Sequence, residues 1–449
     1  MLNANVGETA NLILGMPPSL AAIVIVAVCY LIIFSEKINR AVIALIGAGV
    51  MIATGILSQK QALTGIDFNT LALLIGMMII VAVSEKSGIF QYVAIWSAKK
   101  VKASPRGLMA ALAIVTAVFS GFLDNVTTVL LIAPVTFQIT RKLRINPYPY
   151  LLLEIFASNI GGTATLIGDP PNILIGSALD LTFMDFVKVL MPVVVITMIV
   201  VIFIFDRFWG VHLKTTNDCK KKVLAMNPSD AIMDKVLLVK ALFVLACVIA
   251  GFISAHHIGL DNGTIALLGA SVLLLLYTFG AKGEEKDGKV QEIFNMVDWI
   301  TIFFFTGLFV IVYGLEVTGV LAYLGQKFVE LTDGSIAKLS FLILWCSAVI
   351  SSVIDNIPFV ATMIPMLKSM EESVGGREAM MPVWWSLSLG ACFGGNGTLI
   401  GASANVVVAG MAMREGHQIG FVKFLLWSVP VMLLSVLIGT VFVYIEFFM

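Results

Sequence analysis

The chain has 449 residues, of which 59% are hydrophobic and only 12% are charged, and its mean hydropathy is +1.00. This composition excludes a soluble globular protein and indicates a polytopic membrane protein. The 28 basic and 28 acidic residues balance, so no nucleic-acid partner is predicted. Polar and apolar residues do not alternate as they would in the strands of a barrel, so the predicted fold class is all-α.

Ten apolar stretches, most of them about 17–20 residues long, predict membrane-spanning helices. Five lie in the first half of the chain, near 18–34, 41–57, 69–84, 148–178 and 189–206. Five lie in the second half, near 237–254, 264–279, 299–315, 380–411 and 425–446. Between the third and fourth span of each half, two short apolar arms surround a polar tip. We expect re-entrant hairpins at about 107–140 and about 339–368; the alternative is two full spans joined by a turn.

The two halves of the chain repeat each other. Six pairs of residues are separated by 231 positions: Asp67 and Asp298, Gly76 and Gly307, Glu85 and Glu316, Gly88 and Gly319, Asp124 and Asp355, Pro134 and Pro365. Gly161–Gly168 matches Gly394–Gly401 at a separation of 233, as Asn172 matches Asn405. Because each half has an odd number of spans, the second copy must be inverted. Inverted repeats with broken helices are typical of secondary transporters.

The basic residues predict the orientation in the membrane. If Glu36–Arg40 is cytoplasmic, 22 of the 28 Lys and Arg residues lie on the cytoplasmic side and 6 lie outside. This bias places both termini outside the cell. The predicted organisation is a first repeat over residues 1–208, a cytoplasmic linker over 209–235 and an inverted second repeat over 236–449.

Each predicted hairpin tip begins with an aspartate. Asp124 starts the run Asp-Asn-Val-Thr-Thr inside the apolar stretch Val115–Val135, and Asp355 starts the run Asp-Asn-Ile-Pro-Phe. A charged side chain at this depth costs about 2.5–3.5 kcal/mol even on insertion scales, so it is functional by default. Two ionised carboxylates brought together there would repel each other, so we expect at least one to hold a proton in the empty site.

Glycine-rich stretches interrupt the fourth span of each half. Helix ends exposed at such a break can bind an ion or a polar oxyacid through N–H groups and carbonyls; the alternative is close helix packing by small residues. The candidate binding residues at the tips and breaks are Asp124, Asn125, Thr127, Thr128, Gly162, Thr163, Thr165, Asp169, Asn172, Asp355, Asn356, Gly395, Asn396, Thr398 and Asn405.

Three carboxylates among amides and hydroxyls suit a cation, or a proton carried on one of the carboxylates. A fully ionised dicarboxylate fits poorly, because no Arg or Lys lies at any break. The candidates for proton coupling are Asp124, Asp169 and Asp355, and Asp169 has no acidic counterpart in the second copy. Na⁺ at the hairpin tips is a further hypothesis, and no other metal or cofactor is predicted. Glu154, whose counterpart is Leu387, is either part of this set or a structural acid.

Two motifs resemble the ion transporter superfamily: Phe122–Thr128 with Pro134, and Asn159–Asn172. The most similar branch holds arsenite permeases, sodium–proton antiporters and the melanosomal P protein. The resemblance implies an elevator mechanism, with a scaffold domain that dimerises and a moving transport domain. In the citrate and dicarboxylate branch the tips carry Ser-Asn-Thr. Here they read Asp124-Asn125-Val126 and Asp355-Asn356-Ile357, which favours a cation, a proton or a neutral oxyacid such as arsenous acid.

The predicted function is therefore secondary active transport of a small inorganic ion or oxyacid with proton coupling, as arsenite-type efflux or sodium–proton antiport. The alternatives are sodium-coupled transport of a di- or tricarboxylate such as citrate, and an ion channel on the same scaffold. No enzyme is predicted, because no nucleophile–base pair appears at membrane depth. The predicted partners are the cargo, the lipid bilayer of a prokaryotic plasma membrane and a second copy in a homodimer.

Overall fold

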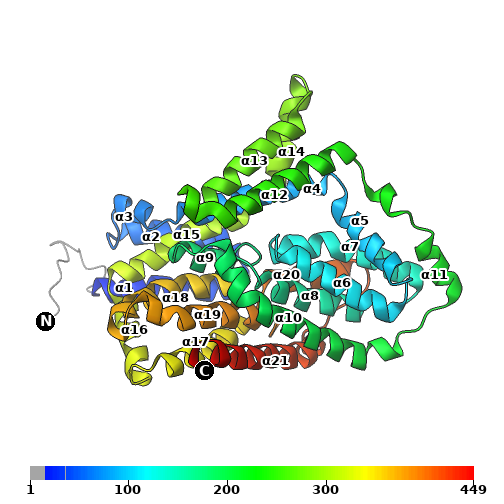
Figure 1. Ribbon diagram of the computed structural model, residues 1–449. Helices are drawn as coiled ribbons and strands as arrows, with labels where there is room; N and C mark the ends of the chain where they lie inside the picture. Colours follow the sequence, from blue (N-terminus) through cyan, green and yellow to red (C-terminus); the bar gives the residue numbers. More distant parts are fainter. Residues whose placement is uncertain (1–15, 36) are drawn as a thin grey trace. The chain divides into compact units, whose positions relative to one another are not determined.

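A computed structural model describes residues 16–35 and 37–449, and all regular elements in these ranges are helices (Figure 1). The predicted all-α class is confirmed. The predicted position of the N-terminus outside the cell concerns residues 1–15, which lie outside the described residues. The helices form two compact units, and each unit draws on both halves of the chain.

Of the described residues, the first unit comprises those up to Leu71, together with Asp298–Ile336 and Ala361–Met380. Its helices are α1 (Pro18–Phe34), α2 (Arg40–Ala53), α3 (Gln59–Thr64), the start of α4 (Phe68–Glu85), α15 (Trp299–Val317), α16 (Val320–Leu331), most of α18 (Asn356–Met370) and the 3₁₀ turn Glu371–Val374.

Helices α2 and α15 pack closely along each other in this unit. A Cβ atom on Gly307 would lie 2.5 Å from the carbonyl carbon of Ala44, so only glycine permits this approach. Arg40 donates to the hydroxyl of Thr301 at 3.1 Å. The predicted span 41–57 extends too far, because α2 ends at Ala53 and Gly55 takes a positive φ of 76° that stops the helix.

The second unit comprises Ala72–Val297, Ala337–Val360 and Met381–Met449. It holds most of α4 and of α17 (Ile336–Val353) and α19 (Arg377–Gly394), and the first residues of α18. It also holds α5 (Ile89–Lys100), α6 (Pro105–Ser120), α7 (Asn125–Leu143), α8 (Tyr148–Gly162), α9 (Pro170–Ala178), α10 (Phe183–Phe208), α11 (Asn217–Leu224), α12 (Lys235–Ile258), α13 (Asn262–Thr278), α14 (Glu284–Met296), α20 (Ser403–Arg414) and α21 (Phe421–Phe448).

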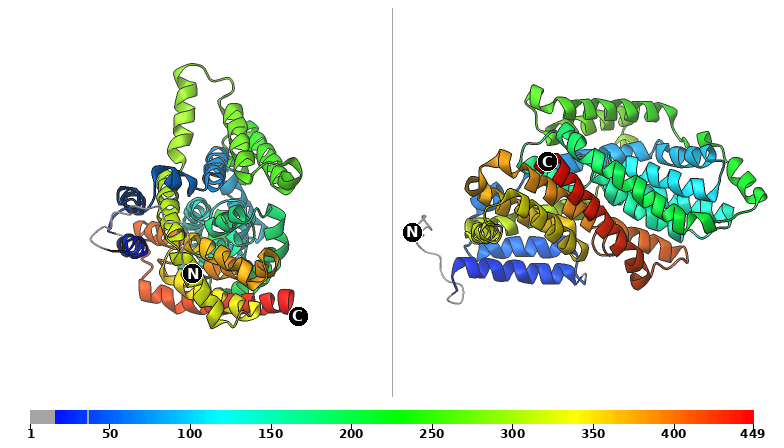
Figure 2. Two further views of the ribbon diagram at one scale, coloured as in Figure 1. Left: turned by 90° about the vertical axis from the view of Figure 1, so that its left-hand side faces the viewer. Right: turned by 60° about the horizontal axis from the view of Figure 1, so that its bottom comes forward.

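Matched glycines bring the hairpin arms against the broken helices in this unit. Helix α6 packs on α8, and a Cβ on Gly161 would lie 2.4 Å from the carbonyl oxygen of Ala117. The counterparts of these two residues repeat the contact, since a Cβ on Gly394 would lie 2.6 Å from the carbonyl oxygen of Ala348. Helices α6, α7, α8 and α20 gather into one cluster (Figure 1), and α12 and α13, drawn in green, lie side by side (Figure 2).

Six helices among the described residues are long and apolar enough to cross a membrane: Phe68–Glu85, Phe183–His212, Lys235–Ile258, Trp299–Val317, Ile336–Val353 and Phe421–Phe448. Shorter apolar helices cover Pro18–Phe34, Arg40–Ala53, Pro105–Ser120 and Asn262–Thr278. This finding supports a polytopic membrane protein. Since Ile336–Val353 is itself long enough to cross, the re-entrant hairpins stay a prediction.

Several helices lie where the sequence predicted none. Helices α5 and α16 each begin directly after a glycine of the repeat, Gly88 and Gly319, which adopt positive φ values of 82° and 76°. The predicted linker contains α11, which packs on α5 and α7. Both α5 and α16 have 12 residues, too few to read as membrane spans.

Candidate functional site

The first hairpin tip is closed by an aspartate that caps its own helix. Helix α6 ends at Ser120 and α7 begins at Asn125. The Thr127 N–H donates to Asp124 Oδ1 at 2.8 Å, and the Thr127 hydroxyl donates to Asp124 Oδ2 at 2.5 Å. The carboxylate therefore satisfies an N-terminal N–H of α7 and lies where the helix dipole favours negative charge.

The second tip uses its aspartate differently. Asp355 Oδ1 accepts from the Ile357 N–H at 3.2 Å, and Oδ2 accepts from the Ser403 hydroxyl at 3.1 Å. Pro358 stands where the first tip has Thr127, and proline has neither an N–H nor a hydroxyl to donate. As a result, Asp355 connects its tip to the first residue of α20.

Both predicted helix breaks are confirmed. Helix α8 ends at Gly162 and α9 begins at Pro170, while α19 ends at Gly394 and α20 begins at Ser403. The last residue of each break has the same extended backbone: φ −143° and ψ 134° at Asp169, φ −149° and ψ 142° at Ala402. The two breaks thus share a backbone conformation although only one of them ends in a carboxylate.

Equivalent asparagines hold the two breaks in shape. Asn172 Nδ2 donates to the carbonyls of Thr163 and Thr165 at 3.0 and 2.9 Å. Asn405 Nδ2 donates at 2.8 Å to two carbonyls of the other break, those of Gly395 and Thr398. Because an unwound segment leaves carbonyls without helical partners, these amides replace the missing hydrogen bonds.

Asn159 of α8 is the centre of a carboxamide cluster. Its Oδ1 accepts from Asn125 Nδ2 of the first tip at 3.1 Å. Its Nδ2 donates to Asn396 Oδ1 and Asn405 Oδ1 of the second break, both at 3.0 Å. All four side chains are buried, so one polar cluster joins the first tip, α8 and the second break.

Asp169 links the first break to the second tip. Asn356 Nδ2 lies 3.3 and 3.5 Å from its two carboxylate oxygens, and Asp169 is 1% exposed. Asp169 precedes α9 in the N-cap position, yet its side chain makes no capping hydrogen bond. Each tip asparagine therefore connects with the break of the other half, Asn125 through Asn159 and Asn356 directly.

Of the four remaining predicted hydroxyls, three bond to backbone carbonyls and one has no partner among the described residues. The hydroxyls of Thr163, Thr165 and Thr398 donate to backbone carbonyls. Thr128 Oγ1 and Asn396 Nδ2 are buried and make no hydrogen bond to other described residues. A buried polar atom without a partner is costly, so these two atoms mark where a bound species can accept or donate.

Sequence reasoning missed three contributors to this site: Asn159, Ser388 and Ser403. Ser388 Oγ donates to Asn172 Oδ1 at 2.6 Å, and Cys392 Sγ lies 3.8 Å from the same oxygen. The signal that could have found Asn159 is its position, since it is a carboxamide at membrane depth two residues before a glycine pair.

The comparisons with known proteins agree with this fold. Residues 30–390 match the family model described as "Citrate transporter", CitMHS. The transporter Rv2684 of Mycobacterium tuberculosis is 41% identical over 434 residues, which cover 96% of this chain and 99% of that protein. The P protein of Mus musculus is 34% identical over 502 residues, which cover 93% of this chain and 59% of that protein.

Two solved structures share the fold at low sequence identity. The YdaH transporter of Alcanivorax borkumensis has a TM-score of 0.59 and 14% identity, and the match covers 97% of this chain and 99% of that one. MtrF of Neisseria gonorrhoeae has a TM-score of 0.56 and 12% identity, with 97% and 96% covered. The resemblance found in the two sequence motifs is confirmed. The chain belongs to the citrate transporter (CitMHS) family of the ion transporter superfamily and is a secondary transporter.

Proposed function

We propose that this transporter moves a small inorganic ion or oxyacid and couples its movement to protons. The observation that carries the proposal is the chemistry of the tips and breaks. The segments 107–140, 148–178, 339–367 and 380–411 contain Asp124, Asp169 and Asp355 but no Lys or Arg. A fully ionised dicarboxylate needs cationic partners in a site without water, whereas a cation or a neutral acid does not.

The carboxamide cluster supports a cargo that both donates and accepts hydrogen bonds. Asparagine offers an acceptor oxygen and two donor N–H groups in one side chain. Among the predicted binding residues, Asn396 Nδ2 and Thr128 Oγ1 are buried polar atoms that make no hydrogen bond to the described residues. Arsenous acid, with three hydroxyls, suits such a site, and so does a partly hydrated Na⁺ at the carbonyls of the breaks. Arsenite-type efflux and sodium–proton antiport are therefore the two forms of the proposal.

Coupling would arise from competition between a proton and the cargo for one carboxylate. Asp169 is the first candidate, because it is buried and its side chain is not used to cap α9. Asp355 and Asp124 are the others. When a cation binds beside the carboxylate, the proton is released, and the exchange of one for the other is antiport.

An elevator movement is the proposed way in which the site reaches both sides. It is supported by the fact that both tips and both breaks belong to the second compact unit. The first unit would then be the scaffold that dimerises. We place this homodimer in a prokaryotic plasma membrane with both termini outside, as the bias of basic residues predicts.

The test is flux into proteoliposomes that hold the purified full-length protein. Uptake of Na⁺, arsenite, citrate and chloride would be compared under imposed pH gradients. We expect D169N and D355N to fold and to lose gradient-driven exchange, and D124N to lose it as well. If the cargo is a neutral oxyacid, the variants should still bind it without coupling.

Asp67→Asn is the matched control for these variants. Asp67 precedes α4 and accepts from the N–H and the hydroxyl of Thr70 at 3.1 and 2.6 Å, as Asp124 does from Thr127. It tests the loss of a capping charge away from the tips. Full proton-coupled transport by all three site variants would overturn the proposal, because the aspartates would then be turn residues only.

The second candidate function is sodium-coupled transport of a di- or tricarboxylate. The family description "Citrate transporter" favours it. Citrate uptake that follows a Na⁺ gradient without any pH gradient would establish this function in place of the first. A channel would be recognised by uncoupled flux much faster than carrier turnover.

A further inference from the structure

Glu154 of α8 is a buried acid that neither the tips nor the breaks require. It is 1% exposed, and Oε1 accepts a hydrogen bond from the hydroxyl of Thr136 on α7. Oε2 is buried and has no hydrogen-bond partner in the described part of the chain. Leu387 takes its position in the second half, so the repeated architecture itself needs no polar group there.

The surroundings favour the neutral form of Glu154. An unpaired carboxylate inside a protein is far more costly than the neutral acid, which keeps its own proton. Helices α6, α7, α10 and α20 pack on α8. Their charged residues lie toward the helix ends: Arg106, Arg141, Lys142, Asp185, Lys188, Asp206, Arg207 and Arg414, followed by Glu415 after α20. Arg106 pairs with Asp206 and Arg141 with Glu415, so these two cations already have partners.

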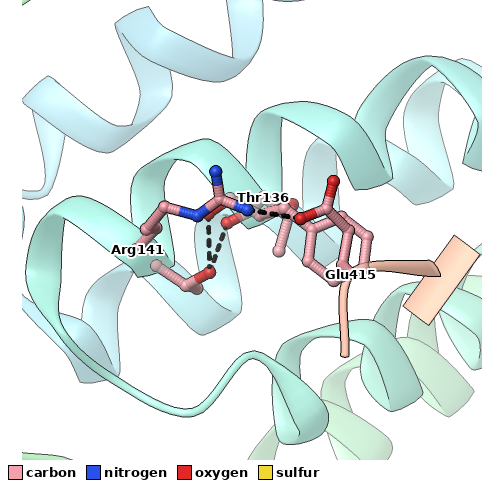
Figure 3. Close-up of polar contacts among 5 residues, drawn as sticks. Thr136, Arg141 and Glu415 are labelled. Atoms are coloured by element: carbon pink, nitrogen blue, oxygen red, sulfur yellow. Dashed lines mark hydrogen bonds and ion pairs between the residues drawn. The ribbon is translucent and has the colours of Figure 1, made fainter. Parts of the chain in front are cut away.

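Hydroxyl groups on α7 lead from Glu154 toward the surface. Thr136 and Thr140 are one helical turn apart and buried, and Thr140 Oγ1 donates to the Thr136 carbonyl at 2.7 Å. Arg141 follows and is exposed, with its guanidinium paired to Glu415 beyond the end of α20. Figure 3 shows Thr136 and Arg141 on this stretch of α7, with Glu415 reaching Arg141.

We propose that Glu154 is a second proton-binding site, separate from the tips and breaks, which exchanges its proton with water on the Arg141–Glu415 side. A proton from water on that side binds at Oε2 and returns to water there, and the hydroxyls of Thr136 and Thr140 make the way along α7 polar enough for water to reach the acid. This inference rests on the proposed proton coupling and adds to it a proton-binding residue that lies outside the hairpin tips. No other bond forms or breaks.

Infrared spectroscopy of the full-length protein in liposomes tests the proposal, with pH and heavy water as the only probes. We expect a stretching band of one protonated carboxyl at neutral pH that E154Q lacks. The band should shift on transfer to heavy water. Thr136→Val should move the band to the position of a more weakly hydrogen-bonded acid and slow its exchange several-fold, and Thr140→Val should slow the exchange alone.

The matched control is Thr197→Val. Thr197 is a buried threonine of α10 whose hydroxyl donates to the Val193 carbonyl at 2.7 Å, so its removal should leave the band and its exchange unchanged. Identical carboxyl bands in E154Q and the parent would mean that Glu154 is ionised, and the proposal would be wrong. A band that does not exchange in heavy water would mean a sealed structural acid and would also overturn it. Since no cargo is used, either failure is distinct from a failure of the proposed transport.

Discussion

The two hairpin tips occupy equivalent positions in the chain, but their aspartates are held differently. Asp124 accepts hydrogen bonds from both the N–H and the hydroxyl of Thr127 in the helix that it caps. Asp355 accepts the hydroxyl of Ser403, the first residue of a different helix. The difference arises because Pro358 replaces the threonine. Asp124 thus caps the helix that follows it, whereas Asp355 connects its tip to α20, a helix that begins at a break.

The two breaks and the helices that lead into them also differ in their side chains at equivalent positions. Asn159 binds three other asparagines, while its counterpart Cys392 lies 3.8 Å from one amide oxygen of Asn172. Asp169 has the same backbone conformation as Ala402 but adds a carboxylate. The repeat therefore preserves the backbone conformation and not the side-chain chemistry. Most of the polar groups that can bind or titrate belong to the first half.

The largest expected effect concerns the glycine pairs at the two breaks. Leucine at Gly162 or Gly395 should abolish transport and leave an inserted protein, because the backbone must approach closely there. Alanine substitutions should have different effects at the two breaks. A Cβ on Gly162 would lie 2.6 Å from the Gly168 carbonyl oxygen, but the nearest atoms to a Cβ on Gly395 are 3.3 Å away. We expect G162A to lose transport and thermal stability, at about 1–3 kcal/mol of overpacking, and G395A to keep most of both.

Gly410→Ala is the control for these variants, because a Cβ there meets nothing within 4 Å. The measurements are proteoliposome flux and the melting temperature of the purified protein. Equal tolerance of alanine at Gly162 and Gly395 would show that the first break is not the more tightly packed one. Unchanged flux in both leucine variants would mean that the binding site lies elsewhere in the protein.

Much of this site could be predicted from the sequence, for a definite physical reason. Gly161-Gly162, Pro170 and Asp124 are residues whose backbone preferences interrupt a helix whatever surrounds them, so the breaks and the first tip follow from local chemistry. The partners of the side chains could not be predicted in this way. The bond from Asn159 to Asn405 spans 246 positions, and it depends on how four helices pack.

The second expected effect tests the difference between Asn159 and Cys392. Asn159→Cys would leave the amide of Asn125 and two carboxamide oxygens without their buried partner. Each such group costs about 1–3 kcal/mol, so we expect a marked fall in melting temperature and a loss of transport of more than about tenfold. Cys392→Ala removes one weak thiol contact and should change both by little. Comparable losses in the two variants would mean that the halves contribute equally.

The smallest expected effect tests the two aspartates themselves. Pro358→Thr would give Asp355 the N–H and hydroxyl that Asp124 receives from Thr127, and these donors would compete with Ser403. A helix cap is worth about 1 kcal/mol, so thermal stability should rise slightly or stay the same while transport falls by as much as in Ser403→Ala. Thr70→Val, which removes the equivalent hydroxyl from Asp67, is the control and should lower stability with transport retained. If Pro358→Thr gains the cap and transports normally, the bond between Asp355 and Ser403 is dispensable, and the two tips are functionally alike despite their different partners.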